Sequence, residues 1–295
     1  MGRGAALVLL ATVFWGTSGT SSTYAPEAAD AQSIGAIRVI LGGVGLLIVA
    51  LIDGRNRARP AWPWLLVILG AIGVGGGQLA FFTAIDRAGV AVSTVLTIGV
   101  APVFTGILSA IYLHQRPGRV WAIATALAVA GASMMVLGTA DTVGGDPVGL
   151  LFGLLGGAGY AVYVTVSKKL LEQGHDAVDV TAAIFCGAAL MMLPIFFLGD
   201  WQWVLEPRGA AVALYLGLAT NAAPYLLFGI GLTLIPVATA ATLTLMEPLT
   251  ATLLGVVWLG ERLSRLQWFG IGLLLTGLLV LAIPDRVRRN FIRSA

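Results

Sequence analysis

Residues 246–277 read MEPLTATLLGVVWLGERLSRLQWFGIGLLLTG, and this stretch holds the features that decide the fold. Two apolar runs flank one short charged loop, and a Glu-Pro pair interrupts the first run. Extended outward, the runs cover about 236–258 and 266–284. Because a helix needs about 20 apolar residues to cross a bilayer, each run is long enough to do so. The stretch therefore predicts two membrane helices joined by a tight turn.

The rest of the chain repeats this pattern of apolar runs and short charged loops. Of the 295 residues, 58% are apolar and only 11% are charged, with a mean hydropathy of +0.93. A soluble domain carries about 25% charged residues, so this chain has too little charge to cover a surface in water. We predict an all-α membrane protein of ten transmembrane helices, at about 4–23, 33–52, 64–84, 90–112, 119–138, 147–168, 179–198, 209–231, 236–258 and 266–284.

The lysines and arginines predict how the chain is oriented. Cytoplasmic loops of membrane proteins carry an excess of both residues. If both termini are cytoplasmic, twelve fall inside and four outside, while Arg38 lies within a span. The distribution of basic residues thus indicates membrane orientation rather than nucleic-acid binding. The inside set is Arg3, Arg55, Arg57, Arg59, Arg116, Arg119, Lys168, Lys169, Arg286, Arg288, Arg289 and Arg293, and the outside set is Arg87, Arg208, Arg262 and Arg265.

An internal repeat relates the two halves of the chain. A shift of 146 residues places Pro102 on Pro248 and the loop Arg116-x-x-Arg119 on Arg262-x-x-Arg265. Five crossings per half is an odd number, so the halves must be inverted relative to each other. We therefore predict a first repeat at 1–143, a second, inverted repeat at 144–285 and a basic cytoplasmic tail at 286–295. Inverted repeats are typical of secondary transporters, which hold their substrate near the bilayer midplane.

These residues resemble the EamA-type members of the drug/metabolite transporter superfamily. The resemblance covers the whole chain, and the chain is similar in particular to amino-acid exporters of the YddG type. It departs from the family where a common Gly-Glu-Arg has become His114-Gln115-Arg116. It implies ten helices, cytoplasmic termini and transport of small metabolites by alternating access in a bacterial inner membrane. The matching elements are Phe14-Trp15-Gly16, Pro102, Glu247-Pro248, Leu259-Gly260-Glu261-Arg262-Leu263, Gln267, Gly270 and Gly277.

Two prolines and two charges stand out inside the predicted spans. Pro102 and Pro248 should kink their helices, because proline removes a helical hydrogen bond and clashes with the preceding turn. They are candidate hinges, with static bending as the alternative. Glu247 either carries a proton or binds a substrate ammonium, or else has an architectural role beside Pro248. Arg38 either attracts a carboxylate or extends its charge outward to the membrane surface.

Polar and aromatic residues embedded in apolar helices are candidates for a substrate cavity. Hydroxyl groups and rings together suit amphipathic solutes, although each residue alone could instead join two helices. Gln78 and Tyr225 occupy nearly equivalent places in the two halves. Gly149, Gly153 and Gly157 form a small-residue face that indicates packing. The cavity candidates are Trp15, Gln78, Phe81, Phe82, Ser93, Thr94, Thr97, Tyr160, Tyr163, Asn221 and Tyr225.

Enzyme signatures are absent from the sequence, so we expect no catalytic residues, cofactor or metal. His114 and His175 lack metal-ligand spacing, and no Walker-type loop is present. We expect a secondary transporter that exports small amphipathic metabolites, above all amino acids including aromatic ones. The alternatives are efflux of organic cations or xenobiotics and, from another class, a membrane-embedded enzyme or a scaffold subunit. The expected partners are a small-molecule substrate and the lipid bilayer, and the chain could be a monomer or a homodimer.

Overall fold

The computed structural model describes residues 2–53, 60–138, 146–260 and 262–282, and these residues form helices without any strand. Nine helical segments in this part of the chain are long and apolar enough to cross a membrane, and a tenth, Arg265–Leu281, is apolar but shorter. The prediction of an all-α membrane protein is confirmed. The 286–295 tail, with Arg286, Arg288, Arg289 and Arg293, lies outside the described residues, as do Arg55, Arg57, Arg59 and Glu261.

The helices follow the predicted spans to within a few residues at each end. The first five are α1 (Arg3–Ser22), α2 (Ala31–Asp53), α3 (Trp64–Ala88), α4 (Val90–Tyr112) and α5 (Arg119–Leu137). The remaining elements are α6 (Pro147–Glu172), α7 (Ala177–Leu198), the short η1 (Gln202–Leu205), α8 (Pro207–Leu214), η2 (Tyr215–Ala222), α9 (Ala223–Leu234), α10 (Val237–Leu243), α11 (Met246–Leu259) and α12 (Arg265–Ala282).

The eighth span departs from a simple α-helix. Between α8 and α9 the chain forms the π-helical segment η2, which ends directly before α9, and Pro224 lies in the first turn of α9. Proline has no N–H to donate, so the hydrogen-bond ladder must adjust around it. Within η2, the hydroxyl of Thr220 donates to the carbonyl of Leu216 at 2.8 Å. Short π segments inside helices are frequently found at functional sites.

The two prolines predicted as hinges behave differently. Pro102 lies inside the continuous helix α4. The ninth span instead divides into α10 and α11, and Pro248 falls in the first turn of α11, where proline is well tolerated. In the divided region, the N–H of Leu245 donates to Thr242 and that of Glu247 to Thr244, which is the tighter three-residue spacing. The interruption therefore precedes Pro248.

Glycines let several helices approach backbone to backbone. An added Cβ on Gly73 of α3 would lie 2.7 Å from the carbonyl oxygen of Gly159 in α6, and the reverse contact is the same. The predicted packing face on α6 also meets its neighbours. Gly149 contacts the end of α3, while Gly153 and Gly157 contact α4. Small residues at such crossings are typical of membrane helix pairs.

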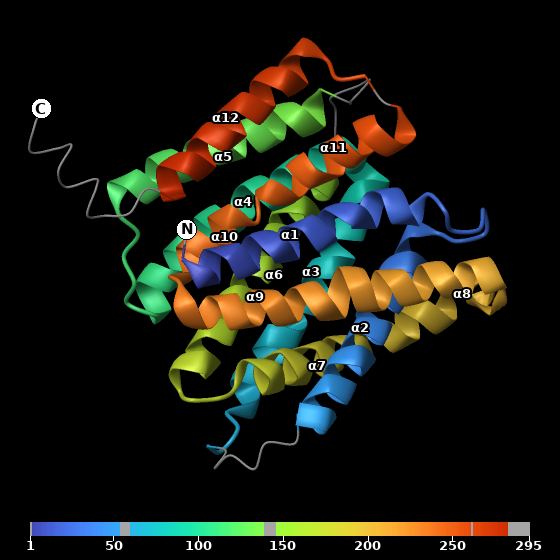
Figure 1. The fold of residues 1–295 in the computed structure, drawn as a ribbon. Helices are drawn as coiled ribbons and strands as arrows, with labels where there is room; N and C mark the ends of the chain where they lie inside the picture. The colour runs from blue at the N-terminus through green and yellow to red at the C-terminus, as the bar shows by residue number, and fades with distance from the viewer. Residues whose placement is uncertain (1, 54–59, 139–145, 261, 283–295) are drawn as a thin grey trace, which may run out of the picture.

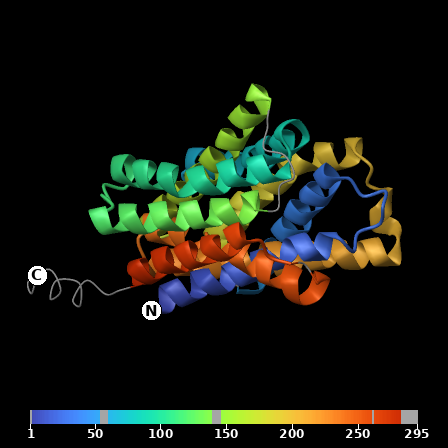
Figure 2. The same ribbon diagram turned by 90° about the horizontal axis from the view of Figure 1, so that it is seen from above.

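The helices form one bundle with two pairs at its flanks. In Figure 1, α5 and α12 lie side by side at one edge, and α2 and α7 pack together at the other. Between them, α1 packs on α9 and α11, while α6 packs on α3 and α4. The start of α1 and the end of α12 lie at the same end of the bundle in Figures 1 and 2. This central set of helices encloses the site described next.

Candidate functional site

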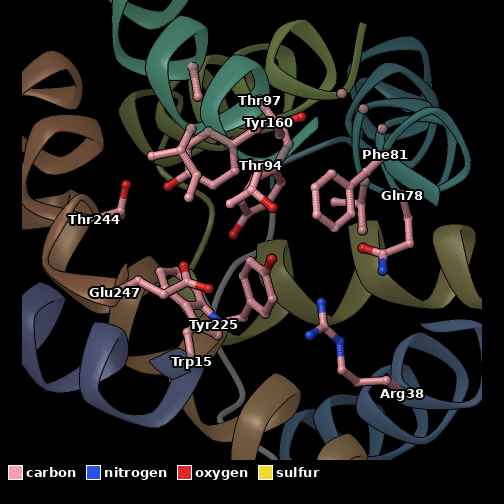
Figure 3. Close-up of a pocket in the computed structure, with 17 residues that line it drawn as sticks. Trp15, Arg38, Gln78, Phe81, Thr94, Thr97, Tyr160, Tyr225, Thr244 and Glu247 are labelled. Carbon is pink, nitrogen blue, oxygen red and sulfur yellow. The ribbon is translucent and has the colours of Figure 1, made fainter. Parts of the chain in front are cut away.

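A cavity of about 220 Å³ lies among the central helices. Its wall comes from α1, α2, α3, α4, α6, α9 and α11, together with the residues that link α10 to α11. Figure 3 shows the lining side chains converging on this space from opposite sides. Helices from the first and the second half of the sequence thus contribute to one internal chamber.

Eight of the eleven predicted cavity candidates line this chamber. They supply three kinds of group, namely rings, hydroxyls and one amide. The hydroxyl of Thr97 also donates to the carbonyl of Gly153 at 3.0 Å, so this residue fixes α4 against α6. The eight are Trp15, Gln78, Phe81, Thr94, Thr97, Tyr160, Tyr163 and Tyr225.

The other three candidates are not among the residues that line the chamber. Phe82 packs its ring against Gly35 of α2, and Ser93 is fully buried. Asn221 in η2 is also buried, and its side-chain amide donates to the backbone carbonyl of Arg38 at 2.8 Å. Asn221 therefore joins the eighth span to α2 beside the chamber.

A cluster of aromatic rings in edge-on and tilted contact forms part of the chamber wall and extends behind it. Tyr225 has its ring centroid 4.8 Å from that of Trp15, 4.3 Å from Phe185 and 5.7 Å from Tyr163. Phe228, which is fully buried, closes the cluster behind them. Edge-on ring contacts of this kind add stability beyond burial alone and hold the rings in fixed positions.

Both intramembrane charges face the chamber. Arg38 comes from α2 and Glu247 from the first turn of α11. Figure 3 shows Glu247 beside Thr244 and Trp15, Arg38 on the other side near Gln78, and Tyr225 between them. The positive end of the α11 dipole favours a carboxylate at this place. Neither charge forms an ion pair or side-chain hydrogen bond within the part of the chain that the structure describes.

Several lining residues were missed by the sequence analysis. Thr244 lies in the link between α10 and α11, a region that the sequence predicts to be one continuous helix. The others are small or aliphatic, and nothing in an apolar run marks a residue of this kind as cavity-lining. These are Gly73, Val74, Gly77, Ile98, Ala101 and Gly156.

The same described region offers no metal centre, since no three His, Cys, Asp or Glu side chains gather there. The chamber is instead a mixed surface of rings, hydroxyls and two opposite charges. Such a surface can hold a small amphipathic solute by ring contact and a few hydrogen bonds.

Comparison with known proteins decides the family. The model of the EamA-like transporter family matches the chain twice, over residues 2–137 and 147–283. The chain belongs to this family. It is therefore a multi-pass membrane transporter of the bacterial inner-membrane type, as the resemblance implied.

Relatives of this transporter extend along almost its whole length. It is 40% identical to the uncharacterized transporter YwfM of Bacillus subtilis over 283 residues, covering 96% of this chain and 95% of that protein. It is 32% identical to the threonine/homoserine exporter RhtA of Escherichia coli over 273 residues, covering 90% and 86%. A solved crystal structure with 19% identity aligns with a TM-score of 0.83 over 95% of this chain and 96% of that one, which shows the shared fold.

Proposed function

We propose that this transporter exports small amphipathic metabolites, amino acids first among them, across the bacterial inner membrane by alternating access. The observation that carries the proposal is the chamber itself, which sets rings, hydroxyls and two charges among otherwise apolar helices. Charged groups are costly inside a membrane and are usually functional there. A polar chamber at this depth suits a solute that must pass through.

Two inverted halves of five helices supply the moving parts in this proposal. Exchanging each helix with its counterpart in the other half preserves the packing pattern. Thus α6 packs on α3 and α4, while α1 packs on α9 and α11; likewise α7 packs on α3, while α2 packs on η2. The separate family matches to 2–137 and 147–283 support the same division, with repeats at 1–143 and 144–285. Ten crossings would also bring both chain ends to one side.

The arginine distribution supports cytoplasmic termini, and this orientation gives the chamber a direction. Arg38 lies within the first two turns of α2, Phe81 within the last two turns of α3, and Thr94 in the second turn of α4. All three helix ends are then external, whereas the ring cluster of Tyr163 and Phe228 lies deeper. We propose that this state faces outward, and that Pro102 and the interruption before Pro248 serve as hinges during the return.

Amino acids are favoured as substrates on two grounds. RhtA, a relative over nine tenths of this chain, is a threonine/homoserine exporter. The chamber volume of about 220 Å³ lies below the roughly 300–1,000 Å³ of drug-sized sites, which favours small solutes. The ring cluster supports aromatic amino acids as further substrates. Efflux of organic cations is less well supported, because Arg38 in the same wall would repel them.

Exchange of labelled solutes in proteoliposomes tests the proposal. The purified protein, reconstituted with and without a pH gradient, should exchange at least one of threonine, homoserine, phenylalanine or tryptophan against the same solute inside. Empty liposomes give the background. Failure to exchange every amino acid, with exchange of an organic cation such as tetraphenylphosphonium, would favour the efflux alternative. Exchange of no solute at all would contradict a transport role.

A further inference from the structure

We propose that the chamber recognises zwitterionic α-amino acids by its two charges, with Arg38 binding the α-carboxylate and Glu247 the α-ammonium. This inference rests on the proposed function, since it states how the same chamber selects its substrate. In Figure 3 the side chains of Arg38 and Glu247 face the chamber from different helices, and the ring of Tyr225 lies between them.

The two charges in the chamber wall have no counter-charge beside them among the described residues. A charge buried in a membrane protein is normally paired or bonded to backbone. Arg38 is half-buried in the chamber wall, and its Nε has no hydrogen-bond partner among the residues that the structure describes. In the part of the chain covered by the structure, neither Arg38 nor Glu247 has a counter-ion within ion-pair distance. Each charge is therefore available to a group that enters the chamber.

The side chains of Arg38 and Glu247 match the two charged ends of an amino acid in their chemistry. The planar guanidinium of Arg38 presents parallel N–H donors, a geometry that suits a carboxylate. Glu247 offers only acceptor oxygens when ionised, which suits the three donors of an ammonium. Its neighbour Trp15 in the chamber wall is 6% exposed, and its buried Nε1 has no hydrogen-bond acceptor among the described residues.

The pair of opposite charges also makes the chamber selective. One positive and one negative side chain leave the chamber without net charge. A cation is attracted by Glu247 but repelled by Arg38, and an anion meets the reverse situation. Only a molecule with both charges satisfies both walls at once. The substrate class that follows is the α-amino acid with both ends unblocked.

The experiment separates the two ends chemically. Competitors are tested against exchange of threonine, or of the amino acid from the panel that exchanges fastest. For threonine, threoninamide replaces the carboxylate by a neutral amide, and 2,3-dihydroxybutanoate replaces the ammonium by a hydroxyl. With the wild-type protein, each should compete roughly 10- to 100-fold more weakly than threonine, as loss of one charged hydrogen bond predicts.

Substitutions then assign each end to one residue. In Arg38→Gln, the apparent affinity for threonine should fall to the affinity that the wild-type protein has for threoninamide. The preference for threonine over 2,3-dihydroxybutanoate should remain. In Glu247→Gln, the apparent affinity for threonine should fall to that of 2,3-dihydroxybutanoate, and the preference for threonine over threoninamide should remain. Arg38→Lys keeps the charge without the fork and should give an intermediate value, which also serves if Arg38→Gln does not fold. Matched controls are Arg87→Gln, whose side chain pairs with Asp146 at 3.1 Å outside the chamber, and Glu206→Gln, which is exposed.

The outcomes separate this inference from the proposed function. If amino acids exchange but both kinds of discrimination survive Arg38→Gln, Arg38→Lys and Glu247→Gln, the charge assignment is wrong and the amino-acid transporter stands. If the wild-type protein exchanges no amino acid, both proposals fail together.

Discussion

Gly131 of α5 and Gly277 of α12 make reciprocal contacts with each other's helices. The two glycines are 146 residues apart. An added Cβ on each would touch backbone atoms of the other helix, and each residue touched by one glycine has a counterpart, 146 residues away, that is touched by the other. Such reciprocity is what a two-fold axis between two halves produces, and it supports the proposed inverted repeat. Gly131 meets Gly270 and Leu274, and Gly277 meets Ala124 and Ala128.

We expect a large side chain at either glycine to loosen the α5–α12 pair. A Cβ on Gly277 would lie 2.6 Å from the carbonyl oxygen of Ala124, so Gly277→Leu must push the helices apart. Overpacking of this kind costs about 1–3 kcal/mol. Thermal unfolding of the detergent-purified protein measures the loss. Gly272→Leu on the same helix is the control, because no described atom outside the local helix backbone lies within 4 Å of an added Cβ there. Equal losses for both variants would refute the packing argument.

Lys168 should stabilise the fold through backbone carbonyls. Its buried amine donates to Leu232 at 2.6 Å and to Ile235 at 3.3 Å, at the carboxyl end of α9, where a cation also suits the helix dipole. Lys168→Met leaves these carbonyls without their donor and should cost about 1–3 kcal/mol. Thermal unfolding beside Lys169→Met checks this. An unchanged midpoint for Lys168→Met would show that the two bonds contribute nothing.

A buried hydrogen-bond cluster joins α5 to α10, and so joins the two proposed halves. The indole N–H of Trp121 donates to Ala238 and to the hydroxyl of Thr242, both at 3.0 Å, and that hydroxyl lies 2.8 Å from the hydroxyl of Thr125. On the orientation we propose, this contact closes the cytoplasmic side in the outward-facing state. Rocking of the halves would have to break it.

Thr242→Val should therefore favour the inward-facing state. Each lost bond is worth about 0.5–1.5 kcal/mol, so external labelling of a cysteine at position 78 should slow by roughly 2- to 10-fold. Thr233→Val is the control, since among the described residues the Thr233 hydroxyl bonds only to Ile230 of its own helix. Faster labelling in Thr242→Val would contradict the assignment of this cluster to the closed side.

Phe81 should limit the size of the transported side chain. It lines the chamber near the proposed external mouth, and the chamber volume is small, about 220 Å³. Phe81→Ala removes a ring and should raise exchange of tryptophan relative to threonine by roughly 10-fold. In a tight pocket, one extra group on a substrate changes the discrimination between substrates by at least that factor. Initial exchange rates for the two amino acids measure the ratio. An unchanged ratio would place the size limit elsewhere.

The sequence predicted most of the fold because apolar runs of about 20 residues leave little choice of structure in a membrane. The same logic located polar side chains such as Gln78 and Tyr160, whose presence in a span needs a reason. It could not separate a cavity residue from one that joins helices. Asn221 looked like a cavity residue but binds the Arg38 carbonyl, and Phe82 fills the space beside Gly35.

Other features depend on packing that sequence patterns do not report. The interruption between α10 and α11 brings Thr244 and Glu247 to the chamber, although Pro248 marks only its neighbourhood. The π-helical form of η2 is likewise invisible in the pattern of apolar residues. Gly73 and Gly156 line the chamber because two backbones cross there, so their place follows from the contact between α3 and α6.

The most direct test of the account asks whether a transported amino acid occupies this chamber. With Cys186 replaced by Ala, Gln78→Cys places a single thiol in the wall, and Phe82→Cys places one outside it. A small polar thiol reagent applied externally should label position 78, and the exchanged amino acid should slow that labelling without affecting position 82. Labelling at position 78 that no exchanged amino acid slows would contradict the chamber as the transport site.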